Sequence, residues 1–329
     1  QGKNAIKSQP IPEPVNGHVQ VRVEAAGVLP ADYKIYDYGL GFVHKYPTVL
    51  GIDAAGEVTK LGPGVTKFKV GDRVAFVGNP NFPEGVSNGD RGAFQQYTLA
   101  DIRVTTKIPS NIDYDSASTF SGNGNTTACI MYDDLKFKEP WLGGEGAYKG
   151  EKIAILGGSS SLGSYLIQFA VLSGLEVITT SSPAHFDYLK SLGATTVIDR
   201  SASDVAAQIL AAAGGPLKYV VDSISLADTQ LLAVEIVQRQ GQLVLVLGSK
   251  PDTTAAAEAK NIAIVQAHGW GINERFWDSL EDYFTRGVIK CNRPTVLPGG
   301  LRAWEEAFDL QRKGKVSGTK IVIRPQETQ

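Results

Sequence analysis

The sequence has few of the residues that mark disulfide-rich, cysteine-metal or membrane proteins. Its 329 residues include two cysteines, Cys129 and Cys291, and no C-x-x-C pair. Two cysteines cannot build a disulfide framework, and the missing pair excludes a zinc site of that type. No apolar run approaches the ~18 residues that a membrane span requires. We therefore expect a protein of the reducing cytoplasm.

The chain also has no excess of charge of either sign. Its 32 lysine and arginine residues nearly balance 34 aspartate and glutamate residues, for a net charge of −2. Without an overall positive field, neither nucleic acid nor an anionic membrane is an expected partner. Nothing at the start is typical of a signal peptide. Because the chain opens at Gln1 without Met, and its first predicted strand (Val19–Glu24) comes late, we expect natural residues to precede it.

The chain does have ample apolar material for a core. It is 43% hydrophobic and 20% charged, and a chain of this size buries about three-quarters of its surface. This composition excludes a disordered, collagenous or coiled-coil protein. At roughly 100–200 residues per domain, the length predicts two domains.

The first 120 or so residues predict an irregular, mostly antiparallel β domain. His18–Val23 alternates apolar and polar residues, and Gly56–Thr59 and Arg73–Val77 are typical of further strands. Gly-Pro-Gly at 62–64 supplies turn chemistry between them. Residues 78–92 predict a long loop, and loops of that length are often functional.

After residue 121 strands alternate with helices, which indicates right-handed βαβ crossovers and a parallel, doubly wound sheet. The closing segment returns to the β domain. We therefore expect a discontinuous β-rich domain, residues 1–121 and 267–329, interrupted by a Rossmann domain, residues 122–266. The predicted strands are Lys152–Leu156, Glu176–Thr180, Val197–Ile198, Tyr219–Asp222, Gln242–Leu247 and Thr319–Ile323; the predicted helices are Asn125–Leu135, Leu162–Ser173, His185–Leu192, Asp204–Ala213, Leu226–Val237, Glu274–Arg286 and Leu301–Arg312.

The strongest motif is a loop of small residues between the strand Lys152–Leu156 and the helix after it. Such a loop brings backbone N–H groups and the positive end of a helix against a pyrophosphate. An ordinary βα turn is the alternative, but strand, loop and helix follow in the order that a dinucleotide site requires. Gly163 would permit close packing of helix on strand. The predicted cofactor-binding residues of this loop are Gly157, Ser159, Ser160, Ser161, Leu162 and Gly163.

The end of the second strand of this domain indicates which dinucleotide binds. An NAD site usually has an acidic residue there, about 20 residues after the loop, for the ribose hydroxyls. This sequence instead has Ser181 and Ser182, whose hydroxyls leave room for a 2′-phosphate. His185, Lys190 and Arg200 would supply positive charge, unless they are solvated surface residues. The missing acid favours NADPH.

Several motifs, taken together and in order, resemble the medium-chain dehydrogenase/reductase superfamily over essentially the whole chain. They are EAAGVLPADYK (24–34), YPTVLGIDAAGEV (46–58), VGDRV (70–74), VLPGGL (296–301) and GKVSG (314–318). The resemblance implies an α/β protein in which a GroES-like catalytic domain joins a Rossmann domain, with the active site in the cleft between them.

The resemblance also separates this chain from the zinc alcohol dehydrogenases of the superfamily. Those enzymes carry a catalytic cysteine near the position of Leu29 and a His-Glu pair after the glycine that matches Gly51. Leu29 and Ile52 cannot ligate zinc, and Asp53 replaces the glutamate without an assigned role. The sequence is most similar to the zinc-independent quinone oxidoreductases and enoyl reductases, and among them to the trans-acting enoyl reductases of fungal polyketide pathways.

The implied reaction is hydride transfer from NADPH to the β-carbon of an α,β-unsaturated carbonyl, or to a quinone. A donor must then meet the charge that develops on the carbonyl oxygen. Lys34 is the first candidate, because the Asp-x-Lys arrangement matches lysine-bearing enoyl reductases; a solvated loop lysine is the alternative. Tyr38 is the second candidate, and Tyr36 is a further possibility unless these aromatic residues only pack.

Further site residues come from the family pattern and from the strand ends. Thr126 and Thr127 match the position of a hydroxyl near the nicotinamide; alternatively, either residue caps the helix that follows. Leu247 and Gly248 end a predicted parallel strand, where ligands of such sheets bind. His18 lies on an edge-like strand, and spacing suggests no partner for the other two unassigned histidines, His44 and His268, so none of the three is expected to be catalytic.

Three functions stay open on the sequence alone. The leading interpretation is an NADPH-dependent, metal-independent enoyl or quinone reductase that acts on a small molecule or a thioester-bound acyl chain. A polyketide synthase carrier domain is then a possible partner, and the protein is a monomer or a homodimer. The other two are a general alkenal or alkenone reductase and a nucleotide-binding protein without turnover.

Overall fold

The computed structural model describes residues 6–39, 47–78, 90–269 and 271–329, and the chain divides into two compact units. The first unit comprises Gln1–Gly122, Ile272–Thr285 and Cys291–Gln329, and the second comprises Asn123–Gly271 and Arg286–Lys290. These bounds differ from the expected domains at residue 122, which belongs to the first unit, and at residues 267–271 and 286–290, which belong to the second. Within the described ranges, no helix has the length and apolar character to cross a membrane.

The first unit is built on a mostly antiparallel sheet of seven strands in the order β12-β13-β1-β2-β3-β5, with β4 also paired to β1. Among the described strands of this unit, only β12 and β13 pair in parallel. The strands are β1 (His18–Gly27), β2 (Asp53–Leu61), β3 (Arg73–Val77), β4 (Tyr97–Asp101), β5 (Thr105–Lys107), β12 (Pro294–Leu297) and β13 (Lys320–Ile323).

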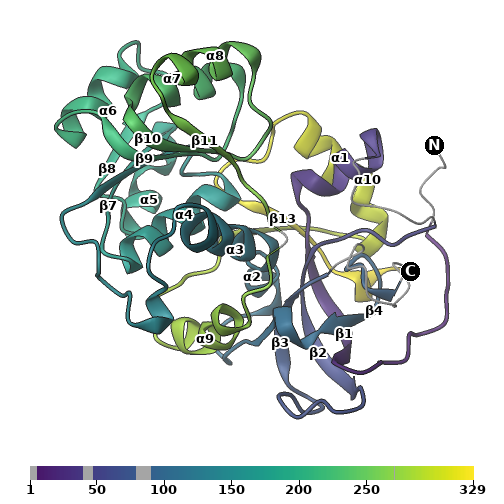
Figure 1. Ribbon diagram of the computed structural model, residues 1–329. Coiled ribbons are helices and arrows are strands. Elements are labelled where there is room, and N and C mark those ends of the chain that lie inside the picture. Colours follow the sequence, from purple (N-terminus) through teal and green to yellow (C-terminus); the bar gives the residue numbers. More distant parts are fainter. Residues whose placement is uncertain (1–5, 40–46, 79–89, 270) are drawn as a thin grey trace. The chain divides into compact units, whose positions relative to one another are not determined.

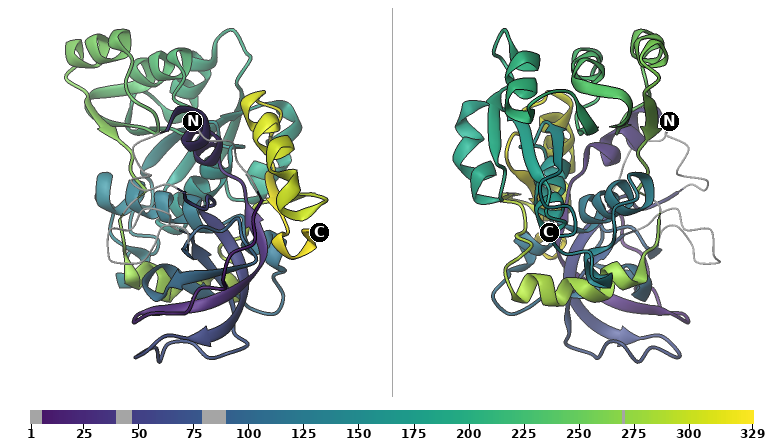
Figure 2. Two further views of the ribbon diagram at one scale, coloured as in Figure 1. Left: turned by 90° about the vertical axis from the view of Figure 1, so that its right-hand side faces the viewer. Right: turned by 60° about the vertical axis from the view of Figure 1, so that its left-hand side comes forward.

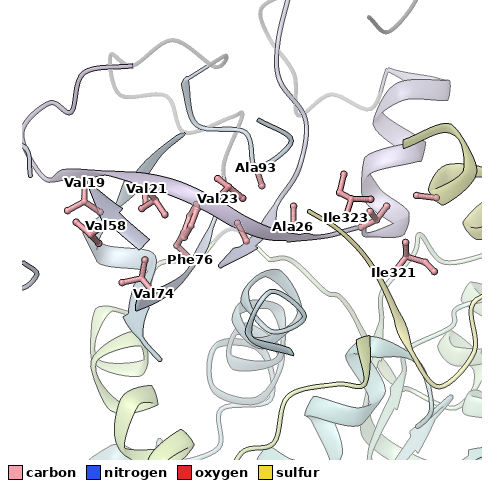
Figure 3. Close-up of a cluster of buried hydrophobic side chains, with 14 of the residues drawn as sticks. Val19, Val21, Val23, Ala26, Val58, Val74, Phe76, Ala93, Ile321 and Ile323 are labelled. Atoms are coloured by element: carbon pink, nitrogen blue, oxygen red, sulfur yellow. The ribbon is translucent and has the colours of Figure 1, made fainter. Parts of the chain in front are cut away.

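The alternation at the start of β1 fills the core of this sheet. Val19, Val21 and Val23 are fully buried, and they pack with Val58 and Phe76 of the neighbouring strands (Figure 3). Burying each such side chain stabilises the fold by about 1.5–3 kcal/mol. The period of two therefore predicted both the strand and its buried face.

The edge position expected for His18 is wrong. β1 pairs with β2 on one side and with β4 and β13 on the other. His18 lies opposite Asp101 of β4 and is 7% exposed. The strand β4 was not predicted from sequence, so the second neighbour of β1 was missed.

Helices flank the sheet of the first unit. They are α1 (Pro30–Tyr38), α2 (Tyr114–Ala117), α9 (Glu274–Thr285) and α10 (Trp304–Arg312). The helix α1 lies beside α10 (Figure 1). The rings of Tyr36 and Trp304 meet there edge to face, with their centroids 5.4 Å apart. Aromatic side chains from α9 surround Phe120, with Phe284 at 5.0 Å.

The second unit contains the predicted parallel sheet, in the order β11-β10-β9-β6-β7-β8. Its strands are β6 (Lys152–Leu156), β7 (Glu176–Ser181), β8 (Thr196–Asp199), β9 (Leu217–Asp222), β10 (Val237–Leu245) and β11 (Ala263–Gln266). This is the doubly wound order in which chain direction across the sheet reverses between β6 and β9.

Helices cover both faces of the parallel sheet (Figures 1 and 2). The helices α4 and α5 lie on one face, and α6, α7 and α8 lie on the other. Their bounds are α4 (Ser161–Leu172), α5 (Phe186–Ser191), α6 (Val205–Ala213), α7 (Ala227–Ile236) and α8 (Pro251–Ala259).

The helix predicted over Asn125–Leu135 has two parts. It begins earlier, as α3 (Ser121–Ala128), and continues as the π-helical segment η3 (Cys129–Asp134). Thr126 and Thr127 therefore lie well inside the helix, so the alternative that they cap it is wrong. The predicted end of the strand at Leu247 is also corrected, because β10 ends at Leu245.

Candidate active site

The turn from β6 into α4 has the geometry of a phosphate-binding loop. Gly157 has φ +79°, a left-handed conformation that other residues rarely adopt. Ser160 is the N-cap of α4, and its side chain accepts a hydrogen bond from the N–H of Gly163 at 2.9 Å. The helix therefore begins directly after the strand, with its positive end at the carboxyl edge of the sheet.

Close packing explains why this loop contains glycines. A Cβ at Gly163 would overlap the carbonyl oxygen of Gly157, so the close approach predicted for Gly163 is present. A Cβ at Gly157 would overlap Ile224, which follows β9. Gly158 was not predicted from sequence, although a Cβ there would overlap the side chain of Thr179 on β7.

The end of β7 lies beside this loop. Thr180 Oγ1 accepts a hydrogen bond from the N–H of Gly157 at 3.1 Å. Ser181 Oγ is buried and has no hydrogen-bond partner among the described residues. The backbone N–H of Arg200 donates to the carbonyl of Ser181 at 2.9 Å, so the backbone of Arg200 lies next to this strand end.

An acidic residue that the sequence argument overlooked lies at the same edge. Asp199 of β8 lies opposite Ser181 in the sheet register. Its Oδ1 accepts hydrogen bonds from the N–H of Ser201 at 3.0 Å and from Ser201 Oγ at 2.7 Å. These hydrogen bonds lower the pKa of Asp199, so the carboxylate already has partners within its own turn.

Two further residues of the predicted phosphate-binding set follow β7 in the chain. His185 closes the short turn Pro183–His185 after Ser182, close in the chain to the end of β7. Lys190 lies in the last turn of α5 and is exposed. An exposed position is also what the alternative of a solvated surface lysine requires.

The predicted nicotinamide-side residues lie in the same unit. Thr127 is fully buried, and its Oγ1 has no hydrogen-bond partner among the described residues. The segment after β11 packs against Thr126, because a Cβ at Gly269 would lie 2.6 Å from Thr126 Oγ1. Leu247 and Gly248 follow β10, and the carbonyl of Gly248 accepts a hydrogen bond from Gln230 at 3.1 Å.

Lys34 and Tyr38 lie four residues apart on α1, which places them on one face of the helix. Lys34 is half-buried, and its ammonium group has no hydrogen bond or ion pair within the described parts of the chain. Burial lowers its pKa. Tyr38 is 70% exposed, whereas the ring of Tyr36 packs against Trp304.

A buried charge network lies beneath the positions that hold zinc ligands in the zinc enzymes. Lys320 on β13 forms an ion pair with Asp53, and both side chains are at most 1% exposed. Lys320 Nζ also donates to the carbonyl of Thr119 at 3.4 Å, and Asp53 accepts a hydrogen bond from the N–H of Gly122. Asp53, to which the sequence assigned no role, therefore links β2, β13 and the start of α3. Lys320 was not predicted, because the sequence around the short strand β13 does not indicate that its lysine is buried.

Asp32 belongs to the same buried network. Its Oδ2 accepts the N–H of Leu29 at 2.8 Å, which fixes the first turn of α1. Burial raises the pKa of Asp32 to about 7, against the opposing effects of the Leu29 N–H and of Lys320. Burial likewise lowers the pKa of Lys320 to about 7, while Asp32 opposes this shift.

Leu29 and Ile52 lie together next to Gly122. A Cβ on Gly122 would be 3.0 Å from Ile52 Cγ2 and 3.3 Å from Leu29 Cδ1. The two positions that match zinc ligands in relatives thus place aliphatic side chains close to Gly122. Among the described residues, no group of three or more His, Cys, Asp or Glu side chains is placed to hold a metal ion.

The histidines have distinct environments. His18 Nδ1 lies 2.9 Å from the carbonyl oxygen of Asn16, and burial lowers its pKa. His268, for which spacing suggested no partner, lies against Asp134, with 3.6 Å between Nε2 and Oδ1. His44 and most of the loop at residues 78–92 lie outside the described residues.

These residues fit a nicotinamide dinucleotide. The glycine turn lets a phosphate approach the backbone at the N-terminus of α4. The buried and unpartnered hydroxyls of Ser181 and Thr127 are open for hydrogen bonds from a ligand. Both features lie at the carboxyl edge of the parallel sheet or on the helix before it, where this fold binds dinucleotides.

Comparisons with known proteins agree with this geometry. Residues 15–110 match the alcohol dehydrogenase GroES-like domain, and residues 161–278 match the zinc-binding dehydrogenase family. The trans-enoyl reductase himH of Aspergillus japonicus is 33% identical over 311 residues, 93% of this chain and 89% of that protein. The trans-enoyl reductase tndF of Aspergillus flavipes is 31% identical over 349 residues, 98% of this chain and 95% of that protein.

Solved structures show the same fold. An alcohol dehydrogenase superfamily protein from Novosphingobium aromaticivorans superposes with a TM-score of 0.79 at 25% identity, over 97% of this chain and 94% of that chain. Two domain families in the expected order and relatives matched over nearly their full length agree with the loop and sheet order described above. The chain therefore belongs to the medium-chain dehydrogenase/reductase superfamily, among relatives that include the trans-enoyl reductases, and is an oxidoreductase that uses a nicotinamide cofactor.

Proposed function

We propose that this protein is an NADPH-dependent, metal-independent reductase of the conjugated double bond of an α,β-unsaturated acyl group. The observation that carries the cofactor choice is the end of β7, where Ser181 takes the place of the usual acid beside the phosphate loop. The trans-enoyl reductases among the relatives support the choice of substrate.

Four side chains of the second unit support NADPH. Ser181 and Ser182 would bind the 2′-phosphate through their hydroxyls, and His185 and Arg200 would supply positive charge. We leave Lys190 out of this set, because its side chain is exposed in the last turn of α5. When bound, the nicotinamide supplies the hydride.

Lys34 is the proposed donor to the substrate carbonyl oxygen. A half-buried ammonium group without a partner in the described chain can place its protons on an oxyanion at little cost. Tyr38, on the same face of α1, is the second donor in this proposal. Because Leu29 and Ile52 are aliphatic, charge on the oxygen would be met by side chains and not by a metal.

The proposed substrate is a thioester-bound acyl chain, with a polyketide synthase carrier domain as the partner that delivers it. This part of the proposal rests on the trans-enoyl reductases among the relatives. The protein would act as a monomer or a homodimer in the cytoplasm.

The decisive assay follows NADPH absorbance with a crotonyl thioester, a small enone and a simple quinone. We expect the thioester to give the highest kcat/KM. A preference for the enone would make the protein a general alkenone reductase, and a preference for the quinone would make it a quinone oxidoreductase. Tight NADPH binding without turnover of any of the three would favour a non-enzymatic role.

Cofactor preference is tested separately from substrate. NADPH should bind at least tenfold more tightly than NADH in a fluorescence titration. Arg200→Ala and His185→Ala should each weaken NADPH binding several-fold and leave NADH binding unchanged. Lys190→Ala is the matched control, because it removes an exposed positive charge from the same segment. Equal affinities of the wild-type protein for both cofactors would contradict the phosphate-site argument.

A further inference from the structure

A histidine–aspartate pair lies near the carboxyl edge of the parallel sheet, and the proposed function leaves it unused. His268 follows the end of β11 by two residues, and its Nε2 is 3.6 Å from Oδ1 of Asp134. The His268 side chain is 44% exposed, whereas that of Asp134 is 8% exposed. One member of the pair is thus accessible to solvent, and the other is held by the fold.

The helix that carries Asp134 has an unusual form at this point. The N–H of Leu135 donates to the carbonyl of Ile130 at 2.9 Å, which is the wide spacing of a π-helix. Such segments are frequent at functional sites. Asp134 Oδ2 is buried and has no hydrogen-bond partner among the described residues. A buried carboxylate that its own fold leaves partly unsatisfied favours a cation beside it.

The charges around this carboxylate come from two segments. Burial raises the pKa of Asp134, and His268 opposes that shift. Asp133 on the same helix raises the pKa of Asp134, and Lys136, which follows the end of that helix, lowers it. His268 lies on the segment that follows β11, whereas Asp134 lies on η3. The pair therefore joins η3 to the edge of the sheet.

The strand order places this pair on the nicotinamide half of the dinucleotide site. The proposed 2′-phosphate site is at the end of β7, on one side of β6. A dinucleotide whose pyrophosphate lies at α4 therefore extends in the other direction, past the ends of β9, β10 and β11. His268 follows the last of these strands.

The segment of His268 is also fixed against the predicted nicotinamide residues. Asn125 Nδ2 on α3 donates to the carbonyl of Gly269 at 2.8 Å and to that of Gly271 at 3.0 Å. Gly269 packs directly on Thr126. The imidazole of His268 is thus attached to a loop that α3 holds in place next to Thr126.

We propose that His268, oriented by Asp134, donates the proton that completes reduction of the conjugated double bond. This inference rests on the proposed function. Once the β-carbon has received the hydride with its electron pair, the electrons of the double bond lie on the α-carbon and the carbonyl oxygen. The proton on Nδ1 of the imidazolium, the nitrogen turned away from Asp134, then forms the new C–H bond at the α-carbon. The neutral imidazole regains a proton from water, to which it is exposed.

The first test needs no turnover. Diethyl pyrocarbonate should carbethoxylate His268 in the cofactor-free protein, and saturating NADP+ should slow this modification at least fivefold, as measured by peptide mass spectrometry. His18, which is 7% exposed, reports on unfolding and should stay unmodified in both samples. Equal modification of His268 with and without bound NADP+ would show that it does not face the cofactor.

The second test follows the proton itself. With crotonyl thioester in D2O, the wild-type protein should place solvent deuterium on one face of the α-carbon. His268→Gln should lower kcat about 100-fold, the lower range for loss of a general acid, and should scramble that stereochemistry. Added imidazole should restore part of the rate.

Asp134→Asn should lower kcat about tenfold with little change in KM, and Asp134→Glu should recover part of that loss, because Asp134 acts through His268. Asp133→Asn, on the same helix but exposed, is the matched control.

The outcomes separate this inference from the proposed function. If the wild-type protein reduces the thioester but His268→Gln retains its rate and stereochemistry, the proton donor is another group and the function stands. If the wild-type protein reduces no enoyl thioester while NADP+ binds, both the role of His268 and the proposed function are contradicted. A loss of rate in His268→Gln that imidazole cannot restore, with deuterium still on one face, would assign His268 a structural role only.

Discussion

Asp32 and Lys320 show how single residues in the first unit combine structural and electrostatic roles. Both are almost completely buried, at 0% and 1% exposure, yet each carries a titratable group. Asp32 fixes the first turn of α1 through the N–H of Leu29, and Lys320 joins β13 to Asp53. Burying charge is costly unless the partners are well placed, so this network should dominate the pH dependence of stability.

Asp32→Asn tests that expectation. The pKa of Asp32 is raised by burial to about 7 in the folded protein, against about 3.9 in the unfolded chain. Between these values the folded state binds the extra proton, so the stability of the wild-type protein falls as pH rises from about 4 to about 7. The variant has no carboxyl group to titrate at this position. Its free energy of unfolding should therefore rise by on the order of 3–4 kcal/mol relative to that of the wild type across that range. Urea denaturation at pH 4.5, 6 and 8 measures the difference.

A partly exposed carboxylate with the opposite shift is the control. Hydrogen bonds from Arg312 lower the pKa of Asp37. Its contribution is therefore present above the unfolded pKa and is lost as pH falls, so Asp37→Asn should approach wild-type stability at low pH. Stability curves of Asp32→Asn and wild type that run parallel across the whole range would show that Asp32 is already charged at pH 5.

Lys34→Met tests the proposed oxyanion donor. Methionine keeps the length and apolar stem of the side chain but cannot donate a hydrogen bond. Loss of one preorganised donor typically lowers kcat by about 10²–10³, whereas NADPH affinity should change less than twofold. Stopped-flow turnover and a fluorescence titration give the two numbers. An unchanged kcat removes Lys34 from the mechanism, and Lys69→Met, an exposed lysine on a turn of the same unit, controls for the loss of charge.

At the scale of whole elements, the sequence predicted the second unit better than the first. In the second unit, apolar runs such as Ile153–Leu156 are buried on both sides and alternate with helices, so β6 and α4 are found within a residue or two. In the first unit α1 was missed, because its aromatic residues obscure a helical period and its start depends on the tertiary position of Asp32. The strand β4 was missed because only its pairing with β1 defines it.

The candidate site divides in the same way. Local chemistry predicted the glycine turn, since Gly157 and Gly163 act within one βα unit. Contacts between distant segments could not be predicted from the sequence. One example is the ion pair of Lys320 and Asp53, which lie 267 residues apart. The partner of His268 was also hidden, because Asp134 reaches it only through the packing of η3 against the segment after β11.

The β6–α4 junction gives a prediction for one structural element. Gly163→Ala would force the new methyl group into the carbonyl of Gly157, so α4 must move away from the strand. We expect NADPH affinity to fall at least tenfold and the melting temperature to fall by several degrees. Gly214→Ala is the matched control: its φ is +78° and its Cβ meets nothing within 4 Å. That variant should lose about 1 kcal/mol of stability and keep wild-type NADPH affinity. Undiminished NADPH binding by Gly163→Ala would argue against phosphate recognition at this turn.

For the whole molecule, the central prediction concerns metal. Both matched superfamily domains occur in zinc enzymes, and one of the two matching families is described as zinc-binding. In this chain, however, Leu29 and Ile52, both close to Gly122, stand at the positions of two zinc ligands. Neither side chain carries an atom that can coordinate zinc, and Lys320 neutralises the nearby Asp53.

Enoyl thioester reduction should therefore keep at least 90% of its rate after exhaustive dialysis against a chelator, and added zinc should not raise it. Elemental analysis of the dialysed protein provides the control for removal. An activity that disappears with the metal and returns with zinc would mean that ligands from elsewhere in the chain rebuild the site, and the side-chain mechanism built on Lys34 would have to be abandoned.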